Sequence, residues 1–303
     1  MDIMDDFQHR LKEAFRYNDL PFGRVHKLFQ EQSRYLEAVM VVRYEGFWVL
    51  ADAFKAFFIE TVELFNTECQ SGISTCTEAY SFFLPRLFHD FQSPCGAEHL
   101  MKSGYPMHAY TILRNTADNL LLSSAALQNI TDFGSIVGLE SGKPYERHSS
   151  KKIRKETERK VRDIMTGSKS GLTPCTIDEL AKWDAMFDDE VHGGRLSFFI
   201  GSEGWWQGAE GLPIFPRFKE RFFAIFINRF WEIAWMMHRL IPLIQPRGIP
   251  LKDEWRGKWC LLNEIFRRFV YSLTEEAGKK IGAAMVEFVD AKFPFNEESE
   301  FPL

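Results

Sequence analysis

The stretch that decides the fold of this 303-residue chain is residues 104–128, GYPMHAYTILRNTADNLLLSSAALQ. When its residues are placed at about 100° intervals around a helix, the apolar ones fall into a single stripe. That stripe comprises Tyr110, Leu113, Ala117, Leu120, Leu121, Ser124 and Leu127. Pro106 suits the first helical turn, where its missing N–H costs nothing. The stretch therefore predicts an amphipathic helix with one buried face.

A charged pair borders this stripe. Arg114 and Asp118 are four residues apart, so their side chains would lie one above the other on a helix. A charged pair at the rim of an apolar face is either a structural ion pair or part of a ligand-binding cleft. The sequence leaves both interpretations open.

Helical spacing of apolar residues extends over most of the chain. We expect further helices at residues 5–17, 24–65, 77–91, 151–165, 176–192, 217–241, 253–272 and 275–292. The sequence shows no convincing alternating strand pattern and no internal repeat. These patterns predict an all-α protein, a multi-helix bundle of up to about ten helices.

Prolines, glycines and caps set the expected boundaries. Gly46 is the candidate break in the long second helix, and Pro85 should kink the third. Residues 93–96 should form another break. Thr176 and Glu179 fit a capping box, which would begin a helix at Thr176.

The segment 217–241 is apolar nearly all round, which predicts a central helix that Pro242 ends. We do not expect it to span a membrane. The most apolar window, 224–244, holds charged and polar side chains that a membrane span rarely carries: Arg229, Glu232, His238 and Arg239.

We expect residues 1–303 to form a single helical domain. The segment 132–175 is the part least like a core, because a weakly patterned loop at 132–144 and a linker at 167–174 flank a highly charged helix. We interpret this segment as an insertion between bundle helices or a mobile arm.

The composition is that of an ordinary soluble globular protein, with 45% hydrophobic and 26% charged residues. The 29 phenylalanines and 8 tryptophans predict an aromatic-rich core or interface. The net charge of −5 argues against nucleic-acid binding by the whole surface, but it leaves room for a local basic patch.

Cysteine usage and the N-terminus predict a cytoplasmic protein. The cysteines are few, odd in number and scattered, which suits a reducing compartment. They are Cys69, Cys76, Cys95, Cys175 and Cys260. The charged start of the chain, MDIMDDFQHRLKEAF, shows no signal peptide.

A second motif, DDEVHGGR, places His192 where a helix meets two glycines. Glycines let a ligand approach the backbone closely, so this turn is a candidate site. Alternatively, His192 is part of a helix C-cap, and Arg114 and Asp118 pair only with each other. The candidate catalytic residues are Arg114, Asp118 and His192, and the candidate binding residues are Tyr110, Asn115 and Glu190.

These two motifs resemble those of HEPN-like prokaryotic helical proteins. In that family, a helix with an arginine and an acidic residue one turn later is followed by a Val-His-Gly-like turn. The counterparts here are LRNTADNL, with Arg114 and Asp118, and EVHGG, with His192. The resemblance covers roughly residues 82–199. It implies an HEPN-like core with an inserted charged arm, and a role in RNA binding or cleavage in a toxin or antiviral-defence setting.

The chain departs from the usual HEPN ribonuclease pattern. Those enzymes generally place the arginine and, a few residues later, the histidine on one helix, and none of the eight histidines here has that spacing. A split site, with Arg114 from one helix and His192 from another, is the version that remains. A histidine with a near-neutral pKa can transfer protons, and an arginine can hold a phosphate.

Metal chemistry has weaker support. His89-Asp90 is typical of HD-type phosphohydrolases, but the further ligands are not singled out by the sequence. A loose zinc-like set lacks the tight pairs that structural zinc sites favour. That set is His89, Cys95, His99 and His108. The absence of Glu-x-x-His argues against a di-iron bundle, so no metal or cofactor is expected.

Two exposed features remain. The basic run KKIRKETERK, residues 151–160, continues to Arg162, and its interleaved glutamates favour a solvated, salt-bridged face. Contact with RNA or another acidic partner is the alternative. Trp205 and Trp206 lie in a glycine-rich loop, where they could stack on a base or a partner or pack on the core.

These observations predict a cytoplasmic HEPN-like helical protein, without membrane contact, that binds or cleaves RNA. The alternative is a non-enzymatic helical interaction module, which would bind a protein partner or a second copy of itself.

Overall fold

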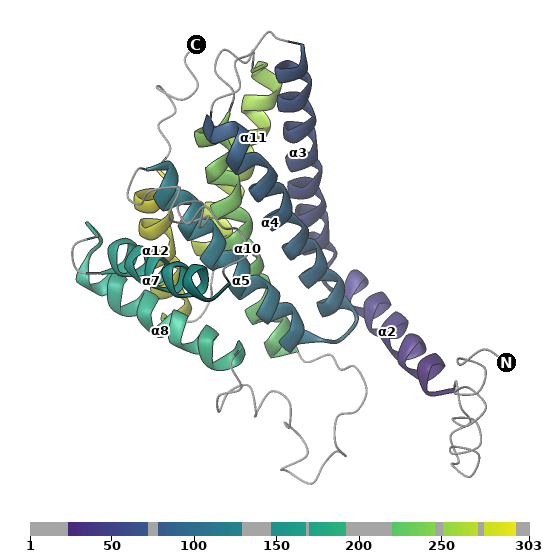
Figure 1. The fold of residues 1–303 in the computed structure, drawn as a ribbon. Helices are drawn as coiled ribbons and strands as arrows, with labels where there is room; N and C mark the ends of the chain where they lie inside the picture. Colours follow the sequence, from purple (N-terminus) through teal and green to yellow (C-terminus); the bar gives the residue numbers. More distant parts are fainter. Residues whose placement is uncertain are drawn as a thin grey trace, which may run out of the picture.

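The computed structural model describes residues 24–71, 78–128, 147–167, 170–191, 220–245, 251–271 and 276–294. Within these ranges the regular secondary structure is entirely α-helical (Figure 1), which confirms the predicted all-α bundle. The helices are α2 (Arg24–Arg43), α3 (Glu45–Gln70), α4 (Glu78–Lys102), α5 (Pro106–Leu127), α7 (Arg147–Thr166), α8 (Pro174–Val191), α10 (Glu220–Ile244), α11 (Asp253–Tyr271) and α12 (Glu276–Lys292).

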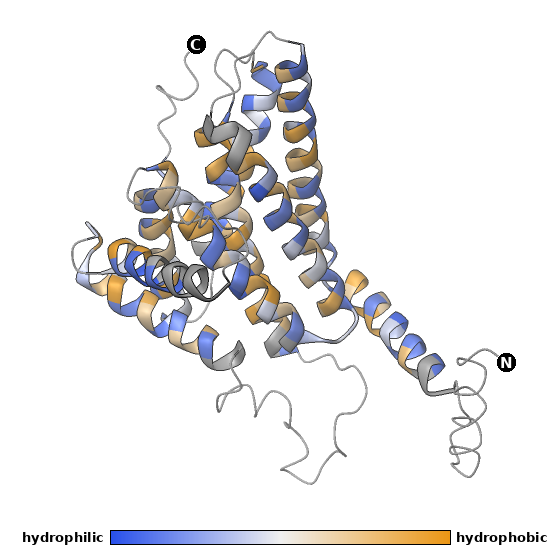
Figure 2. Cartoon of the chain, viewed as in Figure 1, coloured by the Kyte–Doolittle hydropathy of each residue, from blue (hydrophilic) through white to orange (hydrophobic). Residues whose placement is uncertain are grey.

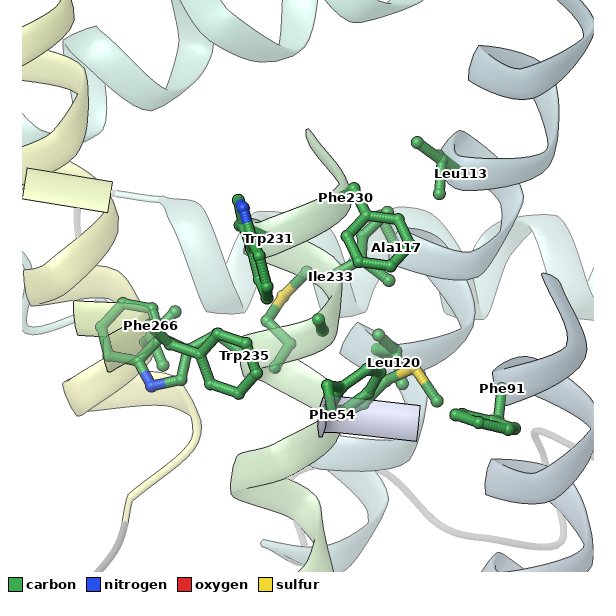
Figure 3. Close-up of a cluster of buried hydrophobic side chains, with 14 of the residues drawn as sticks. Phe54, Phe91, Leu113, Ala117, Leu120, Phe230, Trp231, Ile233, Trp235 and Phe266 are labelled. Atoms are coloured by element: carbon green, nitrogen blue, oxygen red, sulfur yellow. The ribbon is translucent and has the colours of Figure 1, made fainter. Parts of the chain in front are cut away.

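Helix α10 lies at the centre of the bundle and packs against α3, α4, α5, α11 and α12. Its position confirms the prediction of a central helix. Phe230, Trp231 and Trp235 from α10 meet aromatic residues such as Phe54 of α3 and Phe266 of α11 in the core (Figure 3). No helix in the described ranges has both the length and the apolar character needed to cross a bilayer.

A tight turn joins α4 to α5. Gly104 has a φ of +83°, a left-handed conformation that suits glycine because it has no Cβ. The Tyr105 amide donates to the Leu100 carbonyl (2.8 Å), and the Gly104 amide donates to the Met101 carbonyl (3.0 Å). These bonds cap the end of α4 in a Schellman pattern. Pro106 begins α5, as its sequence position predicted.

The apolar stripe of α5 is buried as predicted. Tyr110, Leu113, Leu120 and Ser124 have no measurable exposure. The remaining members of the stripe, Ala117, Leu121 and Leu127, are buried or partly buried. The core around α10 therefore fixes which side of α5 carries Arg114 and Asp118.

Two helix ends predicted at prolines are wrong. Helix α4 continues through both Pro85 and Pro94, although residues 93–96 were expected to break it. Helix α10 continues past Pro242 to Ile244. A proline removes one backbone hydrogen bond. Here both helices pack along their neighbours, so tertiary contacts outweigh that loss.

Two helix starts also differ from the prediction. The chain breaks at Tyr44, between α2 and α3, and not at Gly46. Helix α8 begins at Pro174, because the Thr173 hydroxyl accepts a hydrogen bond from the Thr176 amide (3.2 Å). Thr173 is therefore the N-cap, and Thr176 lies inside the first turn.

The predicted charged helix is present as α7, which packs on α5 and α8. A small second hydrophobic cluster joins α7 to α5 through Leu122, Ala125, Val161 and Met165. Helix α8 packs chiefly against α12 and α5. These contacts place α7, α8 and α12 together at one side of the bundle, with α2 and α3 at the other (Figure 1).

Cys69, near the end of α3, is disulfide-bonded. Cys95, Cys175 and Cys260 are not disulfide-bonded.

Several predictions fall outside the described residues. They concern the helix at 5–17, the loop at 132–144, His192, and the pair Trp205 and Trp206.

Candidate functional site

Arg114 on α5 is buried, with 5% of its surface exposed, and it binds two carboxylates. Its Nη1 lies 2.5 Å from Asp118 Oδ1, one turn along α5, and its Nε donates to Asp188 Oδ1 of α8 at 2.7 Å. Burial alone would lower the pKa of Arg114, but Asp118, Asp188 and nearby Asp184 outweigh that effect and raise the pKa. Arg114 therefore stays charged and ties α5 to α8.

Arg162 brings α7 into the same network. Its Nη2 donates to Asp118 Oδ1 at 2.7 Å, and its Nη1 donates to Asp184 Oδ2 at 3.1 Å. The Arg162 side chain is about one-third exposed, as are both of its partners. Asp118 Oδ1 consequently accepts hydrogen bonds from two arginines on different helices.

A third arginine, Arg229 of α10, reaches α8 from inside the core. Its Cζ lies 3.7 Å from the centre of the Trp183 ring and 3.9 Å from that of Phe187, which are cation–π distances. Its Nη2 donates to the Trp183 carbonyl (2.6 Å). Its Nη1 and the Trp183 indole both donate to Glu232 Oε2. Burial raises the pKa of Glu232, and the charge of Arg229 partly opposes that rise.

Three helices, α5, α7 and α10, thus each contact α8 through an arginine. We call the set that makes these contacts the α8 junction. It comprises Arg114, Asp118, Arg162, Trp183, Asp184, Phe187, Asp188, Arg229 and Glu232.

The sequence of α8 explains why Arg229 contacts one side of this helix while Arg114 and Arg162 contact another. Trp183 and Phe187 are four residues apart, so they form one buried aromatic face. Asp184 and Asp188 follow each of them by one residue, so they lie about 100° further round the helix. The aromatic face receives Arg229 from the core, and the acidic edge receives the other two arginines.

The structure brings some predicted site residues together and leaves others apart. Arg114 and Asp118 are in contact, and Asn115 is exposed beside them. Tyr110 is fully buried in the core. Glu190 lies in the last turn of α8, but its side chain is outside the described residues, as is His192.

The last described turn of α8 lies close to Arg114. Helix α8 ends at Val191, and Asp188, three residues earlier, contacts Arg114. The described end of α8 therefore lies beside Arg114 through Asp188. Whether the His192 imidazole reaches Asp118 stays a prediction.

Sequence patterns did not single out six members of the α8 junction as site residues: Trp183, Asp184, Phe187, Asp188, Arg229 and Glu232. Two signals could have found them. The first is an acidic pair at four-residue spacing beside an aromatic pair with the same spacing. An arginine inside an otherwise apolar central helix is the other, because a buried arginine needs acceptors nearby.

The formal charge of the α8 junction is −1, from three arginines, three aspartates and one glutamate. Every one of these arginines already faces a carboxylate. A site with this balance does not attract phosphate by itself. Its arrangement is suited to positioning helices.

Positive charge gathers on α7 instead. Its 20 residues include eight lysines and arginines and three acidic residues, a formal charge of +5. The whole chain carries −5, so the other 283 residues together carry −10. Lys155, Arg159 and Lys160 are exposed, whereas Val161 and Met165 are buried.

The His89-Asp90 pair of α4 is arranged structurally. Asp90 is buried and accepts hydrogen bonds from Asn119 (2.9 Å) and Arg86 (3.3 Å), and His89 Nδ1 lies 3.6 Å from it. Protein donors thus take up the carboxylate that a metal would need. Among the described residues, no group of three or more histidine, cysteine or acidic side chains is arranged to hold a metal ion.

Comparison with known proteins gives no significant match, either to a protein family, to a curated protein or to a solved structure.

Proposed function

We propose that this chain is an HEPN-like helical protein that binds RNA through the exposed face of α7, in a toxin or antiviral-defence setting. The observation that carries the proposal is the charge of α7, which is +5 in a chain of −5. Concentrated lysine and arginine on one helix is the electrostatic pattern that proteins use to neutralise phosphates. The resemblance of the α5 and His192 motifs to HEPN-like proteins supplies the RNA setting.

The contacts of α7 support this role because they direct its basic face outward. Val161 and Met165 pack on α5, and Arg162 pairs with Asp118 and Asp184. The exposed basic residues of α7 lie outside this packed face: Lys155, Arg159 and Lys160. They are available to a ligand.

The proposal extends from RNA binding to cleavage of the bound RNA. His192 follows α8 directly and would carry proton transfer, with Asn115 and Glu190 near the substrate. Arg114 and Asp118 would act mainly by holding α8 in place, because Arg114 is buried between two carboxylates.

Binding is tested by fluorescence anisotropy with a short labelled single-stranded RNA. The variant Lys155→Gln, Arg159→Gln, Lys160→Gln should weaken binding at least about tenfold at low salt. Each lost phosphate contact should also reduce the slope of log K against log salt by about 0.7, so three contacts give about 2.

A matched control removes three exposed basic residues elsewhere. They are Arg268 of α11 and Lys279 and Lys280 of α12, each replaced by glutamine. The charge change is the same, so this variant should keep the affinity of the wild-type protein. Equal loss in both variants would show that net charge, and not α7, governs binding, and would overturn the proposal.

Cleavage is tested separately with the purified protein. His192→Ala should abolish RNA cleavage while leaving anisotropy binding unchanged. Wild-type cleavage by a folded Arg114→Ala, His192→Ala variant would end the catalytic version without affecting the binding proposal.

A second candidate is a non-enzymatic helical interaction module. The complete pairing of buried Arg114 with Asp118 and Asp188 favours it, because a catalytic arginine must be free to contact substrate. Failure of the wild-type protein to bind RNA at low salt would favour this candidate over the first.

A further inference from the structure

Arg162 differs from the other two arginines of the α8 junction because solvent reaches it. Its side chain is 32% exposed, whereas those of Arg114 and Arg229 are 7% and 1% exposed. The guanidinium groups of Arg114 and Arg229 are enclosed by protein, so a ligand in solution does not contact them. Arg162 is therefore the arginine of the α8 junction that a phosphate can reach.

Arg162 also continues the exposed basic face of α7. Lys155 and Arg159 are four residues apart, and Arg162 follows three residues later. At about 100° per residue these three side chains lie within about 60° of one another, over about 10 Å of the helix axis. Lys155 and Arg159 are exposed, and hydrophilic residues predominate in the described part of α7 (Figure 2). An RNA strand that contacts both residues would bring a further phosphate towards Arg162.

Two carboxylates occupy Arg162 in this structure. Its Nη2 donates to Asp118 Oδ1 at 2.7 Å, and its Nη1 donates to Asp184 Oδ2 at 3.1 Å. The side chains of Asp118 and Asp184 are 37% and 38% exposed, so water reaches both ion pairs. Ion pairs that are open to solvent contribute little to stability, so a competing anion can replace them.

Asp118 keeps a partner when Arg162 leaves. Its Oδ1 also accepts a hydrogen bond from Arg114, which Asp188 holds in place from α8. Of the two carboxylates on Arg162, only Asp184 would then need to be rehydrated, and its exposure allows this. The α8 junction can therefore release Arg162 without stranding a buried charge.

We propose, on the basis of the RNA binding by α7 proposed above, that Asp118 and Asp184 hold Arg162 in an autoinhibitory contact that a phosphate of the bound RNA displaces. A guanidinium binds phosphate as it binds carboxylate, through paired hydrogen bonds. A strand already held by Lys155 and Arg159 presents its next phosphate at high effective concentration, which a free phosphate ion does not. The acidic partners thus select a polyanion over single phosphates.

A double-mutant cycle tests the exchange in the anisotropy assay with labelled RNA. Asp184→Asn should raise the RNA affinity about two- to fivefold at low salt, because it removes one competing ion pair. Arg162→Gln should weaken binding and reduce the slope of log K against log salt by about 0.7, the share of one phosphate contact. In the Arg162→Gln background the gain from Asp184→Asn should disappear.

The matched control is Asp178→Asn, which removes the same charge from an exposed residue of the same helix. Any gain that it gives should be equal with and without Arg162→Gln. No gain from Asp184→Asn, or a gain that persists with Arg162→Gln, would overturn the autoinhibitory contact alone. A wild-type protein that binds no RNA would refute the proposed function as well.

Arg162→Lys separates a phosphate contact from a structural link. A lysine ammonium binds phosphate as a point charge, but it lacks the planar fork that holds two carboxylates. Arg162→Lys should therefore keep the salt slope of the wild-type protein, while its free form exchanges the α7 amides as fast as Arg162→Gln does. An Arg162→Lys variant with the reduced slope of Arg162→Gln would overturn the proposal.

Discussion

Replacing Arg114 by alanine should destabilise the fold through the carboxylates it leaves behind. Each hydrogen bond to a charged group contributes about 1.5–3 kcal/mol, and Arg114 makes two. Breaking a fully buried ion pair costs about 3–5 kcal/mol. Here Asp118 and Asp188 are 37% and 43% exposed and can be rehydrated, and Asp118 also keeps Arg162. We therefore expect a loss of about 2–4 kcal/mol in the free energy of unfolding.

Equilibrium urea unfolding followed by circular dichroism measures this loss. For a chain of this size, about 2 °C of melting temperature accompanies each kcal/mol, so the melting point should fall by about 4–8 °C. Arg114→Lys should recover only part of the stability, because an ammonium lacks the planar fork that reaches both carboxylates. Asn115→Ala, at the adjacent exposed position, should change stability by less than about 0.5 kcal/mol.

A double-mutant cycle separates the ion pair from the lost packing of Arg114. With Asp188→Asn as the second change, the coupling energy should be about 1 kcal/mol or more. An Arg114→Ala variant with wild-type stability and no coupling to Asp188 would refute the structural role. If the same variant had lost RNA cleavage, Arg114 would instead belong to the reaction itself.

Two other regions of the fold give predictions of a different kind. His238 is buried against Trp259, and burial lowers its pKa to about 3. The unfolded chain takes up this proton near pH 6.5, so stability is full above that pH and falls by about 1.4 kcal/mol per unit towards pH 3. In urea unfolding, the wild-type protein should lose stability between about pH 7.5 and about pH 4.5, and His238→Phe should lose less. An equal loss in both proteins would contradict the prediction. Arg162→Ala should speed amide hydrogen exchange in α7 but not in α10, because Arg162 links α7 to both Asp118 and Asp184. Equal changes in both helices would contradict a local role for Arg162.

Local periodicity predicted the elements whose burial is set by their own sequence. The stripe of α5 and the apolar surface of α10 are visible in single windows of the chain, and both helices are buried as expected. Rules for proline failed at Pro94 and Pro242, because they describe an isolated helix. There, packing against neighbouring helices compensates for the lost hydrogen bond, and those neighbours are not adjacent in sequence.

In the candidate site, too, only the contact between residues close in sequence was predictable. Arg114 and Asp118 could be paired because four-residue spacing fixes their contact. The contacts of Arg114 with Asp188, and of Arg162 with Asp118, join residues 74 and 44 positions apart. A buried arginine is expected to have carboxylate partners. The sequence does not show which acidic residues of the other helices these partners are.

The α8 junction also determines how mutational data on this protein must be interpreted. Arg114, Arg162 and Arg229 hold the same helix, and that helix ends one residue before His192. Loss of any one arginine can displace residue 192 without that arginine touching RNA. Reduced cleavage in such a variant is therefore no proof of a catalytic role. Only a variant that keeps both its stability and its RNA affinity, yet loses cleavage, assigns chemistry to a residue, and the segment that follows α8 in the sequence, with His192, is where such a variant should be sought.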